Sequence, residues 1–283
     1  MKKYIFIAES GADLPQAFVD AHDIRVVQMN VEIDGQNYLD QEVDLDFLVD
    51  YHKRTGKIPK TAGANPAQYA EVYEAIKAEH PDAVVLHICY SEQLSVSYQS
   101  SVIADDGSLQ MYHIDSKNVT AGQGIVIMKA VELVERQPDI EPDELVAYIE
   151  EIISKIRFSF IPGDIDYLRA GGRVSNAQYL GARLLRVKPL IEVVDGLMLS
   201  TKKYKGSKKD IVLKALAEFL EKNPIKKDKM LLGYVYSLED SIKEEMEAMV
   251  AAAGVGEVEW IKAGAVITSH SGPGGVGILG IES

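Results

Sequence analysis

The chain has 283 residues, of which 47% are hydrophobic and 26% charged, a balance typical of a folded globular protein large enough for two domains. Its net charge of −13 argues against nucleic acid or an anionic membrane surface as partner. The single cysteine, Cys89, excludes an internal disulfide and suits a reducing compartment. The apolar stretch at the N-terminus ends at Glu9, too early for an export signal, and no long apolar run follows. We therefore expect a cytoplasmic protein with no stable membrane insertion.

The first half of the chain alternates β-rich runs with segments of helical period. We predict strands over Tyr4–Ala8, Ile24–Ile33, Val84–Ile88 and Leu109–Ile114, with a hairpin turn at Asp34-Gly35. We predict helices over Leu14–His22, Asp44–Arg54, Asn65–His80, Ser91–Ala104 and Ala121–Gln137. Unbroken apolar strands that alternate with helices indicate a parallel sheet covered on both faces.

The pattern changes after Pro138–Pro142, where a helix over Asp143–Ile156 is expected. The dipeptide Asp195-Gly196 predicts an antiparallel hairpin. The remaining predicted elements are strands Val187–Val194, Leu197–Tyr204, Met230–Tyr236 and Val258–Ile261 and helices Lys208–Lys222 and Leu238–Ala253. The sequence thus favours an α/β fold of two α/β domains. Residues 1–157 would hold a mostly parallel sheet flanked by helices, and residues 158–283 a mixed sheet with helices.

The glycine-rich tail Gly272–Gly277 matches the dinucleotide pattern G-x-G-x-x-G. It lacks the following helix and the acidic residue about twenty positions on that such a site needs. Two interpretations remain: a tight turn, or a backbone segment that approaches a ligand closely. His270, just before it, stands among small hydroxyls and glycines, so it is either a site residue or a structural one. Cys89 and the strand histidines His87 and His113 are interpreted as core side chains.

Hydroxyl side chains gather in two further segments, Pro59–Pro66 and Tyr90–Tyr98. The second directly follows a predicted strand, where α/β folds place ligands. Hydroxyls at helix starts are usually caps, but exposed N–H groups and the helix dipole also make such segments receptors for anions. Neither segment carries a metal-ligand cluster or an activated nucleophile, and we expect the chain to have no metal site and no catalytic residue.

A diglycine, Gly171-Gly172, lies between Arg169 and Arg173. One interpretation is a helix C-terminus, broken by glycine and with Arg169 offsetting the dipole. The other is a guanidinium offered to a phosphate or carboxylate.

Taken together, segments spread over nearly the whole chain resemble, in the same order, the motifs of the DegV family. They are Glu9-Ser10-Gly11-Ala12-Asp13-Leu14-Pro15, Pro59-Lys60-Thr61-Ala62, Tyr90-Ser91-Glu92-Gln93-Leu94-Ser95-Val96-Ser97-Tyr98-Gln99-Ser100, Leu168-Arg169-Ala170-Gly171-Gly172-Arg173-Val174 and Ser269-His270-Ser271-Gly272-Pro273-Gly274. The chain departs from the family pattern at Glu9, Gly11, Ala62 and Val96-Ser97, where the family has Asp, Thr, Ser and Gly-Thr.

The resemblance implies two α/β domains that hold a long-chain fatty acid such as palmitate, stearate or oleate between them, with the tail in an apolar tunnel. It places Thr61, Ala62, Ser95, Ser97 and His270 around the carboxylate, Ala62 through its backbone N–H. It implies no cofactor and no catalysis by this chain alone. The implied partner is a separate ATP-binding fatty acid kinase subunit that phosphorylates the carboxylate, and Arg173 matches the family arginine assigned to that encounter.

Alternatives from other classes stay open. The first is a hydrolase or acyltransferase that uses His270 and a nearby serine, although the sequence has no nucleophile elbow G-x-S-x-G and no evident acid partner for the histidine. The second is a regulatory module that senses lipid without passing it to a kinase.

Overall fold

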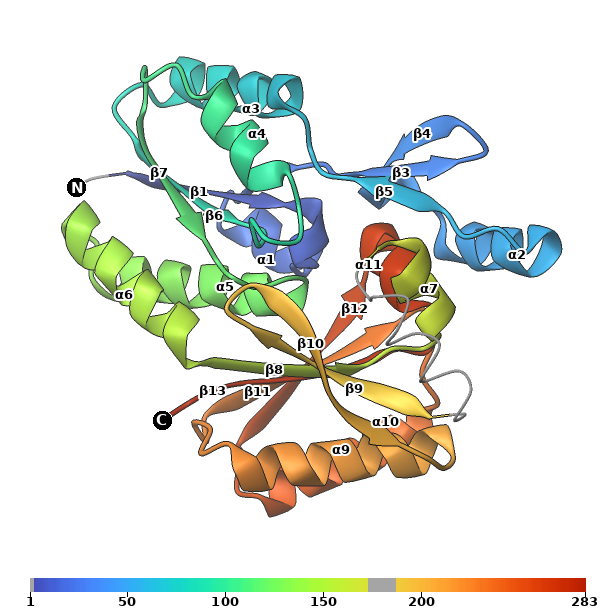
Figure 1. Cartoon of the computed structure of the whole chain (residues 1–283). Helices are drawn as coiled ribbons and strands as arrows, with labels where there is room; N and C mark the ends of the chain where they lie inside the picture. The colour runs from blue at the N-terminus through green and yellow to red at the C-terminus, as the bar shows by residue number, and fades with distance from the viewer. Residues whose placement is uncertain (1–2, 173–186) are drawn as a thin grey trace.

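The computed structural model describes residues 3–172 and 187–283. At the centre of its N-terminal half lies a parallel sheet with strand order β2-β1-β6-β7. Helices α3 and α4 cover one face of this sheet, and α5 and α6 lie on the other (Figure 1). The strands are β1 (Tyr4–Glu9), β2 (Arg25–Val27), β6 (Val84–Cys89) and β7 (Gln110–Asp115). The helices of this half are α1 (Gln16–Ala21), α2 (Leu45–Thr55), α3 (Pro66–Glu79), α4 (Ser97–Ala104), α5 (Ala121–Arg136) and α6 (Pro142–Lys155).

Strand β6 shows why this half folds as the apolar pattern predicts. All six of its residues are buried, and successive side chains point to opposite faces. Val85 packs in a cluster with Tyr69 and Tyr73 of α3, whereas Leu86 belongs to the cluster that contains the apolar side chains of α5. The helix α3 begins with a capping box from Asn65, as the Asn65-Pro66 pair predicts.

The chain between β2 and α3 builds a separate antiparallel sheet of strand order β4-β3-β5. Its strands are β3 (Asn30–Ile33), β4 (Gln36–Leu39) and β5 (Lys60–Ala62). The hairpin predicted at Asp34-Gly35 is confirmed, because β3 and β4 pair across it. The single strand expected over Ile24–Ile33 is wrong. Its first part, β2, pairs with β1, and after Gln28-Met29 the chain crosses to the small sheet as β3.

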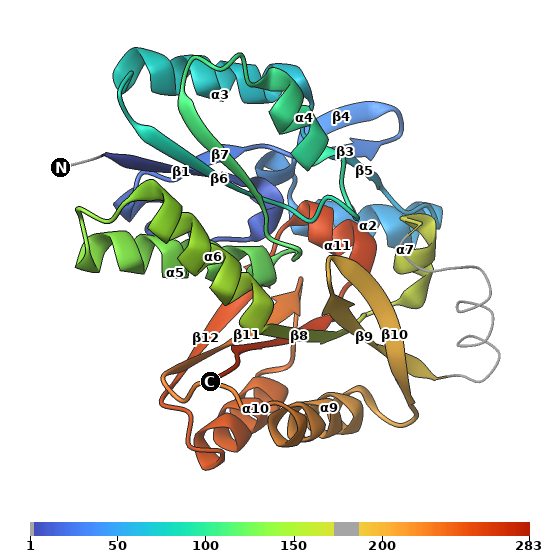
Figure 2. The same ribbon diagram turned by 60° about the vertical axis from the view of Figure 1, so that its left-hand side comes forward.

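The C-terminal half contains a six-stranded mixed sheet of order β10-β9-β8-β13-β11-β12. Helices α9 and α10 cover one face, and the other face is turned toward the N-terminal half (Figures 1 and 2). The strands are β8 (Ile156–Ile161), β9 (Lys188–Val194), β10 (Leu197–Tyr204), β11 (Lys229–Val235), β12 (Glu257–Ala263) and β13 (Val276–Ile281). The helices are α7 (Ile165–Ala170), α9 (Lys208–Lys222), α10 (Asp240–Ala252) and α11 (Ala265–Ser271). The hairpin predicted around Asp195-Gly196 is confirmed.

The two central strands of this sheet, β8 and β13, and the short helix α11 are not among the predicted elements. The helix expected to reach Ile156 ends at Lys155, and the chain continues at once as β8. The glycine-rich tail hides β13, because Gly277 and Gly280 contribute no apolar side chain to its pattern. A boundary between residues 157 and 158 would fall inside β8, and the division into two domains stays a prediction.

The two halves share apolar packing. One cluster of buried side chains includes Ile88 of β6, Phe158 of β8 and Leu279 of β13. Among residues 3–172 and 187–283, no helix is both long enough and apolar enough to cross a membrane.

Candidate functional site

A cavity of about 540 Å³ lies between the loops of the N-terminal half and the sheet of the C-terminal half. Its volume is within the range of ordinary small-molecule sites. Most of its surface is apolar, with contributions from both halves of the chain. These include Met29, Leu94, Val119, Phe158, Leu168 and Met198.

The central strands of the C-terminal sheet form what we call the apolar floor, defined by Phe158, Phe160, Gly233, Gly277 and Leu279, all of which line the cavity. Gly233 of β11 and Gly277 of β13 are direct partners in the sheet. A Cβ atom added to Gly277 would meet the ring of Phe158 at 3.4 Å, an ordinary contact. The two glycines therefore leave space above the sheet that side chains would otherwise fill.

A second region, the polar cluster, is defined by three polar side chains that line the cavity, Thr61, Ser95 and His270, and by Ser97 next to them. The hydroxyl of Thr61 lies 2.7 Å from Nε2 of His270, across 209 positions of sequence. The hydroxyls of Ser95 and Ser97 lie 2.9 Å apart. Gly63 links the two pairs, because a Cβ atom there would lie 2.7 Å from Ser97 Oγ and 2.8 Å from Ser95 Oγ.

The structure thus brings the predicted residues together, with differences of detail. Thr61, Ala62, Ser95 and His270 line the cavity, and Ala62 is exposed. Ser97 is fully buried behind Ser95 and does not line the cavity; its backbone N–H donates to the Ser95 hydroxyl at 3.2 Å. The role given to each residue stays a prediction. Arg173 lies outside the described residues.

His270 reaches the cavity from the last turn of α11, and two carboxylates of the N-terminal half hold the start of that helix. Asp13 accepts a hydrogen bond from the N–H of Gly264 at 2.8 Å, and Asp40 accepts one from the N–H of Val266 at 2.8 Å. Negative charge at a helix N-terminus is favourable. The position of His270 therefore depends on residues from both halves of the chain.

Burial raises the pKa of both carboxylates. Burial, and next the neighbouring charge of Asp40, raise the pKa of Asp13 to about 8. Burial also raises the pKa of Asp40, against the hydrogen bonds from Val266 and Ser10. The structure therefore favours a proton on this carboxylate pair at neutral pH, which the sequence did not indicate.

The diglycine segment also belongs to this region. Helix α7 ends at Ala170 with Gly171 as its C-cap and Arg169 in its last turn, so the helix-end interpretation is confirmed. A Cβ atom on Gly171 would lie 2.1 Å from Nδ1 of His270, which only a glycine avoids. The first part of the glycine-rich tail is a turn, as one interpretation of it predicted. Gly272 and Gly274, between α11 and β13, have positive φ angles of +72° and +83°.

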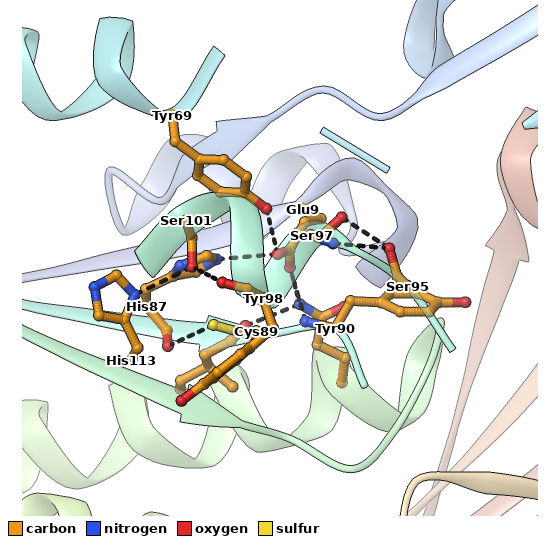
Figure 3. A network of polar contacts seen from close by, with 12 residues as sticks. Glu9, Tyr69, His87, Cys89, Tyr90, Ser95, Ser97, Tyr98, Ser101 and His113 are labelled. Carbon is orange, nitrogen blue, oxygen red and sulfur yellow. Dashed lines mark hydrogen bonds and ion pairs between the residues drawn. The ribbon is translucent and has the colours of Figure 1, made fainter. Parts of the chain in front are cut away.

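A buried polar network supports the loop that carries Ser95 and leads into α4 at Ser97 (Figure 3). At its centre is Glu9, at the carboxyl end of β1 and only 1% exposed. One carboxylate oxygen accepts from the Tyr69 hydroxyl at 2.6 Å and the other from the backbone N–H of Tyr90 at 2.9 Å. Burial alone would raise the pKa of Glu9, but the charge and hydrogen bond of His87 and further donors outweigh it, so the pKa is lowered. An ionised Glu9 thus fixes the start of the loop.

The comparisons with known proteins agree with this geometry. A family model described as "Uncharacterised protein, DegV family" matches residues 4–283. The chain belongs to the DegV family. A DegV domain-containing protein of Clostridium perfringens is 31% identical over 283 residues, which cover 96% of each chain.

Solved structures of other DegV proteins have the same fold. A DegV family protein from Thermus thermophilus, described as fatty acid binding, superposes with a TM-score of 0.85 at 25% identity, covering 99% of this chain and 100% of that one. A fatty acid binding DegV family protein from Streptococcus agalactiae also gives a TM-score of 0.85 at 25% identity, over 100% of both chains. The α/β architecture predicted from sequence, with a parallel N-terminal and a mixed C-terminal sheet, is confirmed.

Proposed function

We propose that this DegV protein binds one long-chain fatty acid, such as palmitate, stearate or oleate, in the cavity between its two sheets. The carboxylate would accept hydrogen bonds at the polar cluster from Thr61, Ser95 and His270, with Ala62 contributing its backbone N–H and Ser97 holding Ser95. The alkyl chain would lie along the apolar floor. The observation that carries the proposal is that a mostly apolar cavity is lined by the hydroxyls of Thr61 and Ser95 and the imidazole of His270.

The energetics fit this division of roles. Burial of a methylene group contributes about 0.8 kcal/mol, so a tail of about fifteen contributes roughly 12 kcal/mol before the costs of association. A desolvated carboxylate without partners would be prohibitively unfavourable. The apolar floor would therefore supply most of the affinity, and the polar cluster would fix the orientation of the fatty acid. The relatives described as fatty acid binding support the same ligand class.

Organic extraction of the freshly purified protein, followed by mass spectrometry, tests the proposal directly. We expect one long-chain fatty acid per chain. Titration calorimetry on the delipidated protein should then give tight binding of palmitate and much weaker binding of methyl palmitate, whose head group carries no charge. A delipidated protein that binds neither compound would contradict the proposal.

We propose further that the protein acts in the cytoplasm as a carrier without catalytic activity of its own, and presents the carboxylate to a separate ATP-binding fatty acid kinase subunit. We expect acyl phosphate to form only when such a subunit and ATP are added to the loaded protein. The variant Arg173→Ala should keep its affinity for fatty acid and lose phosphorylation. An equal loss of both would contradict the assigned role of this arginine.

The alternatives differ from the carrier in measurable ways. For a hydrolase, the available contacts are unfavourable: His270 Nε2 faces Thr61, and the hydroxyl of its neighbour Ser269 donates to the carbonyl of Ala265 at 2.8 Å. Turnover of an acyl ester by the purified chain would nevertheless establish one. A lipid-sensing module would bind fatty acid and remain inert toward an added kinase and ATP.

A further inference from the structure

A cluster of metal-ligating side chains lies in the N-terminal half, in the network of Figure 3. His87 and Cys89 are two residues apart on β6, so their side chains point to the same face of the sheet. His113 of β7 is the direct partner of His87 in the parallel ladder and points to that face as well. The donor atoms of these three residues lie within 4.8 Å of one another. Strand geometry alone thus brings two imidazoles and a thiol together.

One ring nitrogen of His87 lies beside a carboxylate and the other has no partner. Its Nε2 lies 3.1 Å from the carboxylate of Glu9, and both side chains are fully buried. An ionised carboxylate only accepts hydrogen bonds, so Nε2 donates to Glu9. Nδ1 is buried and has no hydrogen-bond partner among residues 3–172 and 187–283. A buried polar atom without a partner is costly, so Nδ1 is the nitrogen that a bound ion would engage.

His113 also contacts a carboxylate, but both of its ring nitrogens have a partner, so an ion bound at Nδ1 would replace the contact with Ser101. Its Nε2 lies 3.2 Å from the carboxylate of Asp105, and its Nδ1 lies 3.2 Å from the hydroxyl of Ser101. Histidines that bind metals usually donate their other N–H to a carboxylate, which fixes the ring and its tautomer. Glu9 and Asp105 stand in that position for His87 and His113.

We infer that His87, Cys89 and His113 form a binding site for a borderline transition-metal cation of the Zn²⁺ type. Two imidazoles and one thiolate are ligands that Zn²⁺ prefers, and a fourth position would remain for water. Bonds of about 2.0 Å to nitrogen and 2.3 Å to sulfur require the donors to close by roughly 1 Å. The His113 side chain is 12% exposed and provides both the adjustment and a route from solvent. Binding would release the thiol proton of Cys89 to solvent.

Such an ion would act on the fatty acid site indirectly. Cys89 directly precedes Tyr90, where the loop that carries Ser95 begins, and Ser101 of α4 contacts His113. The ion would join β6 and β7 beneath α4 and stabilise this corner of the fold. The inference departs from the expectation that the chain binds no metal, which took these residues as core side chains. It is independent of the proposed ligand of the cavity.

Cobalt substitution provides the test. The full chain, treated with chelator and kept reduced, is titrated with Co²⁺, and the thiolate-to-cobalt charge-transfer absorption is recorded; Zn²⁺ is then added as competitor. We expect one equivalent of Co²⁺ to produce the absorption and Zn²⁺ to abolish it. Elemental analysis should give one zinc per chain after dialysis. Wild-type protein without the charge-transfer absorption would overturn the inference.

Variants locate the ion. Cys89→Ser should lose the absorption, and His113→Asn should weaken Zn²⁺ binding at least about 10-fold. His80→Gln, at the surface end of α3, serves as the matched control and should bind like wild type. Circular dichroism checks that each variant folds, and the partly exposed His113 provides a second test should the buried Cys89→Ser variant not fold. Stoichiometric zinc in both folded variants would place the ion elsewhere and contradict the assignment.

Discussion

The polar cluster and the apolar floor of the cavity are built in opposite ways. The cluster joins side chains from distant parts of the chain, Thr61 of β5, Ser95 of the loop after β6 and His270 of α11. The floor comes from adjacent strands of one sheet, and its defining feature is the missing side chains of Gly233 and Gly277. The cluster thus depends on how the two halves are held together, whereas the floor depends on a single sheet. Changes to the two regions should therefore affect different properties of the ligand.

The largest effect is expected at the polar cluster. His270→Ala or Ser95→Ala should each weaken palmitate binding by about 1.5–3 kcal/mol, the range for hydrogen bonds to a charged group, or roughly 10- to 150-fold in Kd. Titration calorimetry measures the change. Binding of methyl palmitate should be far less sensitive, since it carries no charge. Wild-type affinity for palmitate in both variants would place the head group elsewhere.

The floor should respond to tail length instead. Gly277→Val fits the strand, because a Cβ atom there makes ordinary contacts, but its side chain occupies space of two or three methylenes. We expect stearate binding to weaken by about 2 kcal/mol, roughly 30-fold, at about 0.8 kcal/mol per methylene. Decanoate, which is shorter, is the internal control and should keep its affinity. Equal losses for both acids would mean that the floor does not hold the tail.

The support of α11 should show as a pH dependence of stability. The pKa of Asp13 rises from its ordinary value of 3.8 to about 8 on folding. Between these values the folded chain holds a proton that the unfolded chain has released, so this contribution is complete below pH 4 and is lost as the pH rises toward 8. The slope is at most about 1.4 kcal/mol per pH unit. Asp13→Asn should flatten the profile, as measured by urea unfolding across this range.

The exposed Asp20 supplies the matched control, and Asp20→Asn should leave the profile of the wild type unchanged. A profile with the wild-type slope in Asp13→Asn would show that the proton is held by another group.

The smallest effect is expected at the contact between the two parts of the polar cluster. Gly63→Ala would place a methyl group 2.8 Å from the Ser95 hydroxyl and displace it. We expect palmitate affinity to fall by about 1 kcal/mol, the value of one typical hydrogen bond. Ile103→Ala, at a position 64% exposed on α4 and outside the lining of the cavity, should leave affinity unchanged. A Gly63→Ala protein that binds like wild type would mean that Ser95 contributes little.

The polar cluster and the apolar floor also differ in how far the sequence predicts them. Local sequence marks Thr61, Ser95 and His270 only as candidates, because hydroxyls at helix starts are usually caps; their roles around a carboxylate come from the resemblance to the DegV family. The parallel sheet is predictable from local sequence, because strands such as β6 are unbroken apolar runs.

The apolar floor cannot be predicted from the sequence, because a glycine in a strand cannot be distinguished from a glycine in a turn until the partner strand is known. For that reason the tail Gly272–Gly277 predicts a turn or a close approach to a ligand and not the start of β13, and β8 directly follows a long helical pattern that obscures it. The pairing of Gly233 with Gly277 and the capping of α11 by Asp13 are long-range contacts. Tertiary packing determines these contacts, and the periodicity of the sequence does not predict them.

The most direct test of the account is a crystal structure of the delipidated chain with a fatty acid that carries bromine at its terminal carbon. The anomalous signal of bromine marks the end of the tail independently of the electron density of the rest of the ligand. We predict the bromine over the apolar floor near Phe158 and Gly277, and the carboxylate within hydrogen-bond distance of Thr61, Ser95 and His270. Bromine at the polar cluster, or a ligand bound outside this cavity, would contradict the account.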